Sequence, residues 1–196
     1  MILRMKILVT NSEIRYHRHT LEEFTWKSSL LTTFVPLMFL RPEADIPVFQ
    51  VSLHAGLDAR KHVQIGRLLA PLLDEGVLIL GSGFTFHNFA YARTEEGQRE
   101  KLRVSVGFNE WVKDATGSAA HADERKSRSA TCFSERDEIL IAWEQTEFGP
   151  GAHARCEHLM PLHVAYGAGT ATGERHLDIA YDGLCIGCRV SSMAWR

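Results

Sequence analysis

The most constraining feature of the sequence is a strand, helix and strand pattern in its first half. Residues 47–53 form a compact apolar run typical of a strand, and Asp58 then provides an N-cap. Apolar positions over 59–73 make one broad helical face, which Gly76 ends. Residues 77–80 form a second apolar run. Short connections in this order predict a βαβ unit, with parallel strands in a sheet covered on both faces.

The rest of the chain continues the alternation of short apolar runs and amphipathic segments. We expect a helix over 98–114, and a second helix after the capping box that Ser134 begins. A short helix is expected over 157–165, ended by Gly167, and a terminal hairpin that turns at residues 182–183. The predicted fold class is α/β.

Composition limits the partners and the location of the protein. The chain has 196 residues, with 22 basic and 24 acidic side chains and 45% hydrophobic residues, which fits one soluble domain. This balance of charge favours neither nucleic acid nor an anionic membrane surface. The longest apolar stretch, residues 30–40, is too short to span a bilayer. Four unevenly spaced cysteines indicate reduced thiols and a cytoplasmic location.

Histidines are the main candidates for chemistry. His87 follows the predicted strand 77–80 and a glycine turn, at the edge where α/β sheets bind ligands. The densest cluster contains His153, His158 and His163. His158 and His163 are five residues apart and do not share a helical face, so one ligand plus one neighbour is more plausible than a pair.

Two further motifs have weaker support. Cys185 and Cys188 form a C-x-x-C motif, which can be a redox pair or half of a zinc site. They lie in a β-like run near the chain end, so a structural role is favoured, while thiolate-bound zinc stays open. His17 and His19 would share a face of a strand, but they lie in a basic polar stretch and are expected to be solvated.

Several blocks occur in a recognisable order from residue 34 to the C-terminus. They are residues 34–37 with 42–48, 66–67 with 74–77, 81–83 with 87–88, 108–111, 153–165 and 190–192. Together they resemble the class III (LigB-type) extradiol ring-cleavage dioxygenases, in the branch that contains DOPA 4,5-dioxygenases. The resemblance implies a single domain with a largely parallel central sheet flanked by helices, here incomplete at the N-terminus.

The resemblance also implies a chemistry and a set of site residues. Members of the family open the ring of a catechol, such as DOPA or another small aromatic diol, with O₂ and a non-haem metal. The metal is Fe(II) or Zn(II), one per complete site. His158 corresponds to a metal ligand and His87 to the acid/base histidine, while His163, His153 and Asn88 correspond to substrate-side positions.

The N-terminal segment departs from the family pattern. Residues 1–33 do not match it, whereas 34–196 resemble the C-terminal portion of the catalytic domain. The family's other two metal histidines have no counterpart, and Leu31 takes the place of a further histidine. We therefore expect an N-terminally truncated or disrupted member. His17 and His19, another chain of a homo-oligomer, or nothing at all could complete the site. The alternative to a dioxygenase is a catalytically inactive fragment.

Overall fold

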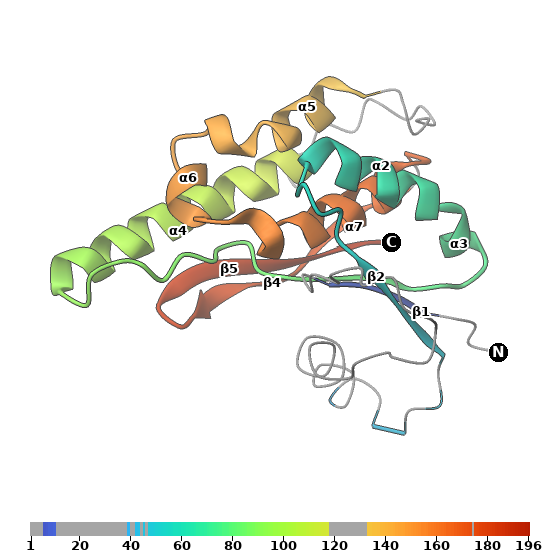
Figure 1. The fold of residues 1–196 in the computed structure, drawn as a ribbon, viewed down its shortest axis with the longest axis horizontal. Helices are drawn as coiled ribbons and strands as arrows, with labels where there is room; N and C mark the ends of the chain where they lie inside the picture. Colours follow the sequence, from blue (N-terminus) through green and yellow to red (C-terminus); the bar gives the residue numbers. More distant parts are fainter. Residues whose placement is uncertain are drawn as a thin grey trace.

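The described strands form two separate sheets beneath a layer of helices (Figure 1). The computed structural model describes residues 6–10, 39, 42–43, 45, 47–117, 133–173 and 175–196. Its strands are β1 (Lys6–Thr10), β2 (Val48–Ser52), β3 (Ile79–Ser82), β4 (Leu177–Cys185) and β5 (Cys188–Trp195). Its helices are α2 (Ala59–Leu69), α3 (Pro71–Asp74), α4 (Glu95–Thr116), α5 (Glu135–Ile141), α6 (Gly149–Ala152) and α7 (Met160–Thr170). Short 3₁₀ turns cover Trp143–Gln145 and Cys156–His158.

The first sheet is parallel and has the strand order β2-β1-β3. Leu8 of β1 lies opposite Gln50 of β2 on one side and Leu80 of β3 on the other. The predicted strand pair β2 and β3 is thus parallel, but the two strands are separated by β1. A strand from the segment that does not match the family pattern occupies the centre of this sheet.

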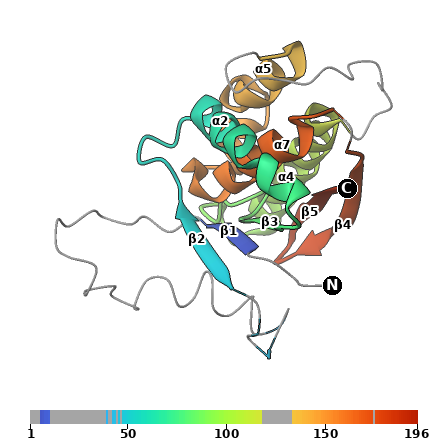
Figure 2. The same cartoon turned by 90° about the vertical axis from the view of Figure 1, so that its right-hand side faces the viewer.

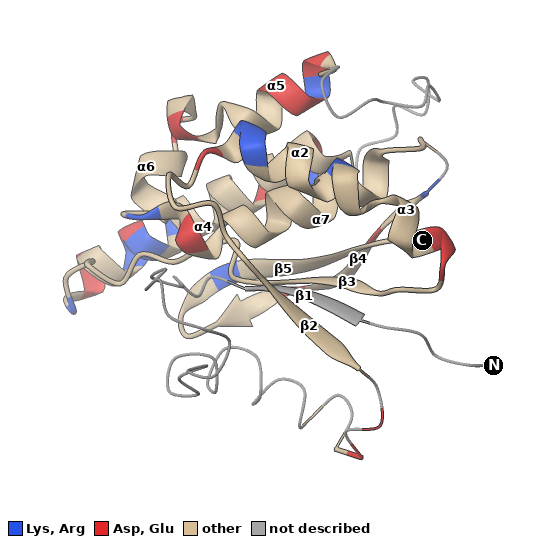
Figure 3. Ribbon diagram, turned by 45° about the vertical axis from the view of Figure 1, so that its right-hand side comes forward, with Lys and Arg blue, Asp and Glu red and all other residues tan. Residues whose placement is uncertain are grey.

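The helices α2 to α7 lie on one side of the strands, as Figures 1 and 2 show from two directions. The sequence predicted helices on both faces of the parallel sheet, whereas the described helices cover one face (Figures 1 and 2). On β2, Val48 and Phe49 remain 38% and 57% exposed. Charged residues gather on the helices, and β2 and β3 carry none (Figure 3). Within the described part of the chain, no helix combines the length and apolar character needed to cross a membrane.

Local signals set the ends of several helices as expected. Asp58 caps α2 by accepting a hydrogen bond from the backbone N–H of Lys61 at 3.0 Å. Pro71 then begins the separate helix α3, so the single helix predicted for 59–73 is divided. Ser134 and Asp137 form the predicted capping box at the start of α5.

Helix α7 continues past the glycine that was expected to end it. The predicted stop, Gly167, lies inside α7, which ends at Thr170. A Cβ atom at Gly167 would overlap the carbonyl oxygen of Val63 in α2, and one at Gly66 would overlap that of Val164. These glycines permit close packing of α2 against α7, and the local sequence alone could not show that partner.

The terminal hairpin turns four residues later than predicted. Asp182 and Gly183 lie within β4, opposite Ser191 and Val190. The turn is at Ile186 and Gly187, whose φ values of 51° and 72° are those of a type I′ turn. Asp182 instead accepts hydrogen bonds from Lys113 and Asn109 of α4, and the Asp-Gly pair stays within the strand.

Candidate functional site

The loop that follows β3 is attached directly to the start of α7. A Cβ atom at Gly83 would overlap the carbonyl oxygen of His158, so only glycine permits this close approach. The next residue, Phe84, donates its backbone N–H to the same oxygen at 2.9 Å. The glycine motif expected to be a turn therefore serves mainly as a contact surface. It brings the carboxyl end of β3 beside the Cys156–His158 turn.

Contacts with α6 fix the position of His87 in this loop. The backbone N–H of His87 donates to the carbonyl oxygen of Ala152 at 3.0 Å, and His87 forms a parallel bridge with His153. The Asn88 side chain donates to the carbonyl oxygen of Gly151 at 2.9 Å and accepts from the N–H of Ala90 at 3.0 Å. Both ends of the Asn88 amide therefore shape the loop.

The structure brings together two histidines that the sequence singled out. The imidazole rings of His87 and His158 stack with centroids 3.5 Å apart and an interplanar angle of 22°. Burial, followed by the proximity of His87, lowers the pKa of His158 below its ordinary value. A neutral imidazole at neutral pH follows, which is the form that binds metal ions.

A carboxylate that the sequence analysis did not select completes a possible ligand group. One donor atom each from His87, Glu157 and His158 lies within 4.8 Å of the others. The Glu157 Oε2 atom is buried and accepts no hydrogen bond within the described residues, although Arg155 Nε is 3.5 Å away. Two imidazoles and one carboxylate form a donor set suited to non-haem Fe(II) or Zn(II). In the sequence, the feature that could have indicated Glu157 as a ligand is its position directly before His158.

His153 is buried and is joined to His87 by a β-bridge. Its Nε2–H donates to the carbonyl oxygen of Thr85 at 3.2 Å, while its Nδ1 is buried with no hydrogen-bond partner in the described structure. Its ring meets Phe108 and Trp143 edge to face. Burial, together with the nearby histidines, lowers the pKa of His153 to about 4. His153 is therefore neutral under ordinary conditions.

The other predicted histidines are not joined to this group. His163 is fully buried in α7, with Nδ1 and Nε2 at 3.3 and 3.2 Å from the carbonyl oxygens of Leu159 and Leu140. Both nitrogens thus face backbone oxygens, and the residue serves core packing instead of offering an atom to a ligand. His17 and His19 lie outside the described residues.

The C-x-x-C motif flanks the hairpin turn. Cys185 and Cys188 lie opposite each other in the hairpin, and both thiols are free. The Cys188 thiol donates a hydrogen bond to the carbonyl oxygen of Cys185. Burial raises the pKa of the Cys188 thiol, which disfavours the thiolate needed for zinc binding or redox exchange. This arrangement agrees with the structural role favoured from the sequence.

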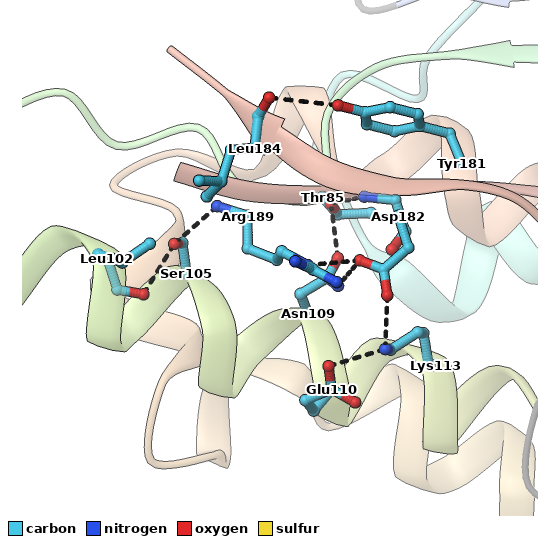
Figure 4. A network of polar contacts seen from close by, with 11 residues as sticks. Thr85, Leu102, Ser105, Asn109, Glu110, Lys113, Tyr181, Asp182, Leu184 and Arg189 are labelled. Atoms are coloured by element: carbon cyan, nitrogen blue, oxygen red, sulfur yellow. Dashed lines mark hydrogen bonds and ion pairs between the residues drawn. The ribbon is translucent and has the colours of Figure 1, made fainter. Parts of the chain in front are cut away.

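A polar network connects the hairpin and α4 to the loop before His87 (Figure 4). Asp182 accepts hydrogen bonds from Arg189 Nε at 2.7 Å, Lys113 Nζ at 2.9 Å and Asn109 Nδ2 at 3.1 Å. Arg189 and then Lys113 hold the pKa of Asp182 well below its usual range. The Thr85 hydroxyl donates to Asn109 Oδ1 at 3.4 Å, so the network reaches the segment that carries His87.

The fold and the site together define an α/β protein with a His-His-Glu group beside the carboxyl end of a parallel strand. Residues 32–184 match the family described as the catalytic LigB subunit of aromatic ring-opening dioxygenase. The chain therefore belongs to the LigB family. The resemblance inferred from the ordered sequence blocks is confirmed.

Individual relatives support the same assignment. The chain is 36% identical over 138 residues to a 4,5-DOPA dioxygenase extradiol of Portulaca grandiflora, covering 70% of this chain and 45% of that protein. It is 27% identical over 151 residues to the 4,5-DOPA dioxygenase extradiol of Escherichia coli K12, covering 77% and 50%. The chain thus spans about half the length of these relatives.

A solved structure shows a similar fold. A crystal structure of an uncharacterized protein from Escherichia coli K12 aligns with a TM-score of 0.62 at 20% identity, over 97% of this chain and 84% of that one. At this level of identity the likeness concerns the fold alone. The mixed helix and strand architecture is therefore shared.

Proposed function

We propose that the protein is an extradiol dioxygenase that opens the ring of a catechol, such as DOPA or a related small aromatic diol, with O₂ and a non-haem metal. The observation that carries the proposal is the stacking of His87 on His158 beside the end of β3. Both residues lie within the part of the chain that matches the family. Free thiols at Cys156, Cys185 and Cys188 support a cytoplasmic location.

His158 is proposed as a metal ligand, with Glu157 beside it. The half-buried imidazole of His158 has a lowered pKa and is neutral near pH 7, and the buried Oε2 of Glu157 lacks a hydrogen bond in the described structure. A divalent Fe(II) or Zn(II) ion fits this donor set. When bound, it would supply a Lewis acid for the two catechol oxygens.

His87 is proposed as the acid/base residue. Its imidazole nitrogen would accept a phenolic proton of the diol and hold it beside the reacting ring. The backbone contact to Ala152 and the loop contacts of Asn88 keep this ring in place before substrate arrives. His153 holds the same loop through its hydrogen bond to the Thr85 carbonyl, and its buried Nδ1 remains as an acceptor for a ligand or water.

The first test is the stoichiometry of iron and zinc in the anaerobically purified chain, followed by catechol-dependent O₂ uptake. We expect about one metal ion per chain in the wild type and loss of metal in His158→Ala. His87→Ala is expected to retain metal and lose O₂ uptake by about 100-fold or more. His176→Ala, a substitution of an exposed histidine, is the matched control and should change neither quantity.

The same measurements separate the proposal from its alternatives. No bound metal and no O₂ uptake would contradict the proposal and support an inactive fragment with the family fold. Metal at one ion per two chains, together with a dimeric mass, would indicate a homo-oligomer in which a second chain completes the site.

A further inference from the structure

Two exposed aromatic rings flank the stacked histidines. Phe84 meets the ring of His158 edge to face, with centroids 6.4 Å apart and an angle of 67°. Phe89 meets the ring of His87 in the same way, at 5.1 Å and 86°. Their residues are 38% and 50% exposed, whereas Phe86, between them in the sequence, is fully buried in the core. The loop thus buries one phenylalanine and presents two beside the site.

Contacts hold the backbone of Phe84 and the ring of Phe89 beside the site. Phe84 is attached by its backbone N–H to the carbonyl oxygen of His158. The ammonium of Lys101 lies 5.2 Å from the ring centroid of Phe89. Lys101 is itself only 6% exposed and donates a 2.7 Å hydrogen bond to the carbonyl oxygen of Ile186 at the hairpin turn. These contacts are present without a ligand, so little ordering of the two residues is left for binding to impose.

We infer that Phe84 and Phe89 form an aromatic rim that binds the planar ring of the substrate and selects an aromatic diol over a ring-free chelator. The inference rests on the proposed function and extends it from the metal and proton chemistry to substrate selection. Aromatic rings attract one another in edge-to-face or offset-stacked arrangements, and an exposed ring can provide such a face to an incoming ligand. The fixed positions beside His87 and His158 would direct the diol end of that ligand toward the histidines.

The test compares two bidentate ligands of the metal-loaded, full-length chain by anaerobic titration calorimetry. Catechol carries an aromatic ring, whereas acetohydroxamate binds metals through two oxygens and has no ring. Phe84→Leu and Phe89→Leu are each expected to weaken catechol binding by about threefold to tenfold, which lies within the range for aromatic pairs. Acetohydroxamate affinity should stay within about twofold of the wild-type value. Phe89→Tyr, which keeps the ring, should retain catechol affinity.

Phe49→Leu is the matched control, because Phe49 is a 57% exposed phenylalanine on β2. Unchanged catechol affinity in both rim variants would overturn the inference, and so would equal losses for catechol and acetohydroxamate. Metal content distinguishes this failure from failure of the proposed function. Wild-type protein that binds metal and catechol, with variants that bind both equally well, refutes the rim alone. Wild-type protein that binds neither refutes the proposed function and the rim together.

Discussion

Substitution of Gly83 by alanine tests whether the close contact between the β3 loop and His158 builds the site. The new Cβ atom would overlap the carbonyl oxygen of His158, which normally requires a C···O separation of about 3.3 Å or more. The loop must move away, and the 2.9 Å hydrogen bond from Phe84 N–H to that oxygen is lost or lengthened.

The expected loss of stability combines two contributions. Overpacking costs about 1–3 kcal/mol and the hydrogen bond contributes about 1 kcal/mol, giving a decrease of about 2–4 kcal/mol in the free energy of unfolding. For a chain of this size the midpoint of thermal unfolding should fall by about 5–15 °C. Because the displaced carbonyl belongs to His158, the proposed metal ligand, bound metal should also decrease.

Thermal unfolding and metal analysis of the same preparation check both effects. Gly56→Ala is the control, because its Cβ would meet only the exposed ring of His54, at 3.2 Å. It should change stability by less than about 0.5 kcal/mol. A Gly83→Ala protein that unfolds at the wild-type temperature and keeps its metal would refute the reasoning.

Three further predictions concern buried charge, pH and the hairpin. Asp137→Asn breaks the buried pair with Arg67 and should destabilise the protein by about 3–5 kcal/mol in urea unfolding, whereas Glu100→Gln, which breaks an exposed pair with Arg103, should leave the urea midpoint nearly unchanged. Burial lowers the pKa of His153 and His163 to about 4, below the unfolded value near 6.5, so the unfolded state binds more protons between these pH values. Stability should therefore fall as pH drops from about 6.5 to 4, by up to about 3 kcal/mol per histidine, and urea midpoints that stay constant over this range would contradict the burial argument. Asp182→Ala removes the acceptor shared by the hairpin and α4 and should lower stability by about 1–3 kcal/mol, with an unchanged unfolding midpoint as the contrary result.

The sequence by itself determined the features that depend on neighbouring residues in the chain. The N-cap at Asp58 and the capping box at Ser134 involve partners only three residues away, so their pattern is visible in the sequence. The ordered blocks were likewise sufficient to identify the family. His87 was selected for its position after residues 77–80 and His158 for its place in the histidine cluster, and the blocks then indicated their roles.

Only the tertiary structure decided which distant segments meet. In the structure β1 lies between β2 and β3. Gly167, expected to end a helix, contacts α2, and Asp182, expected in the hairpin turn, lies within a strand. It also directed His163 into the core and set Glu157 beside the two site histidines. The physical reason is that a glycine, an aspartate or a histidine has several compatible local roles. The partner supplied by packing, such as a carbonyl oxygen, an arginine or a second imidazole, selects one of them.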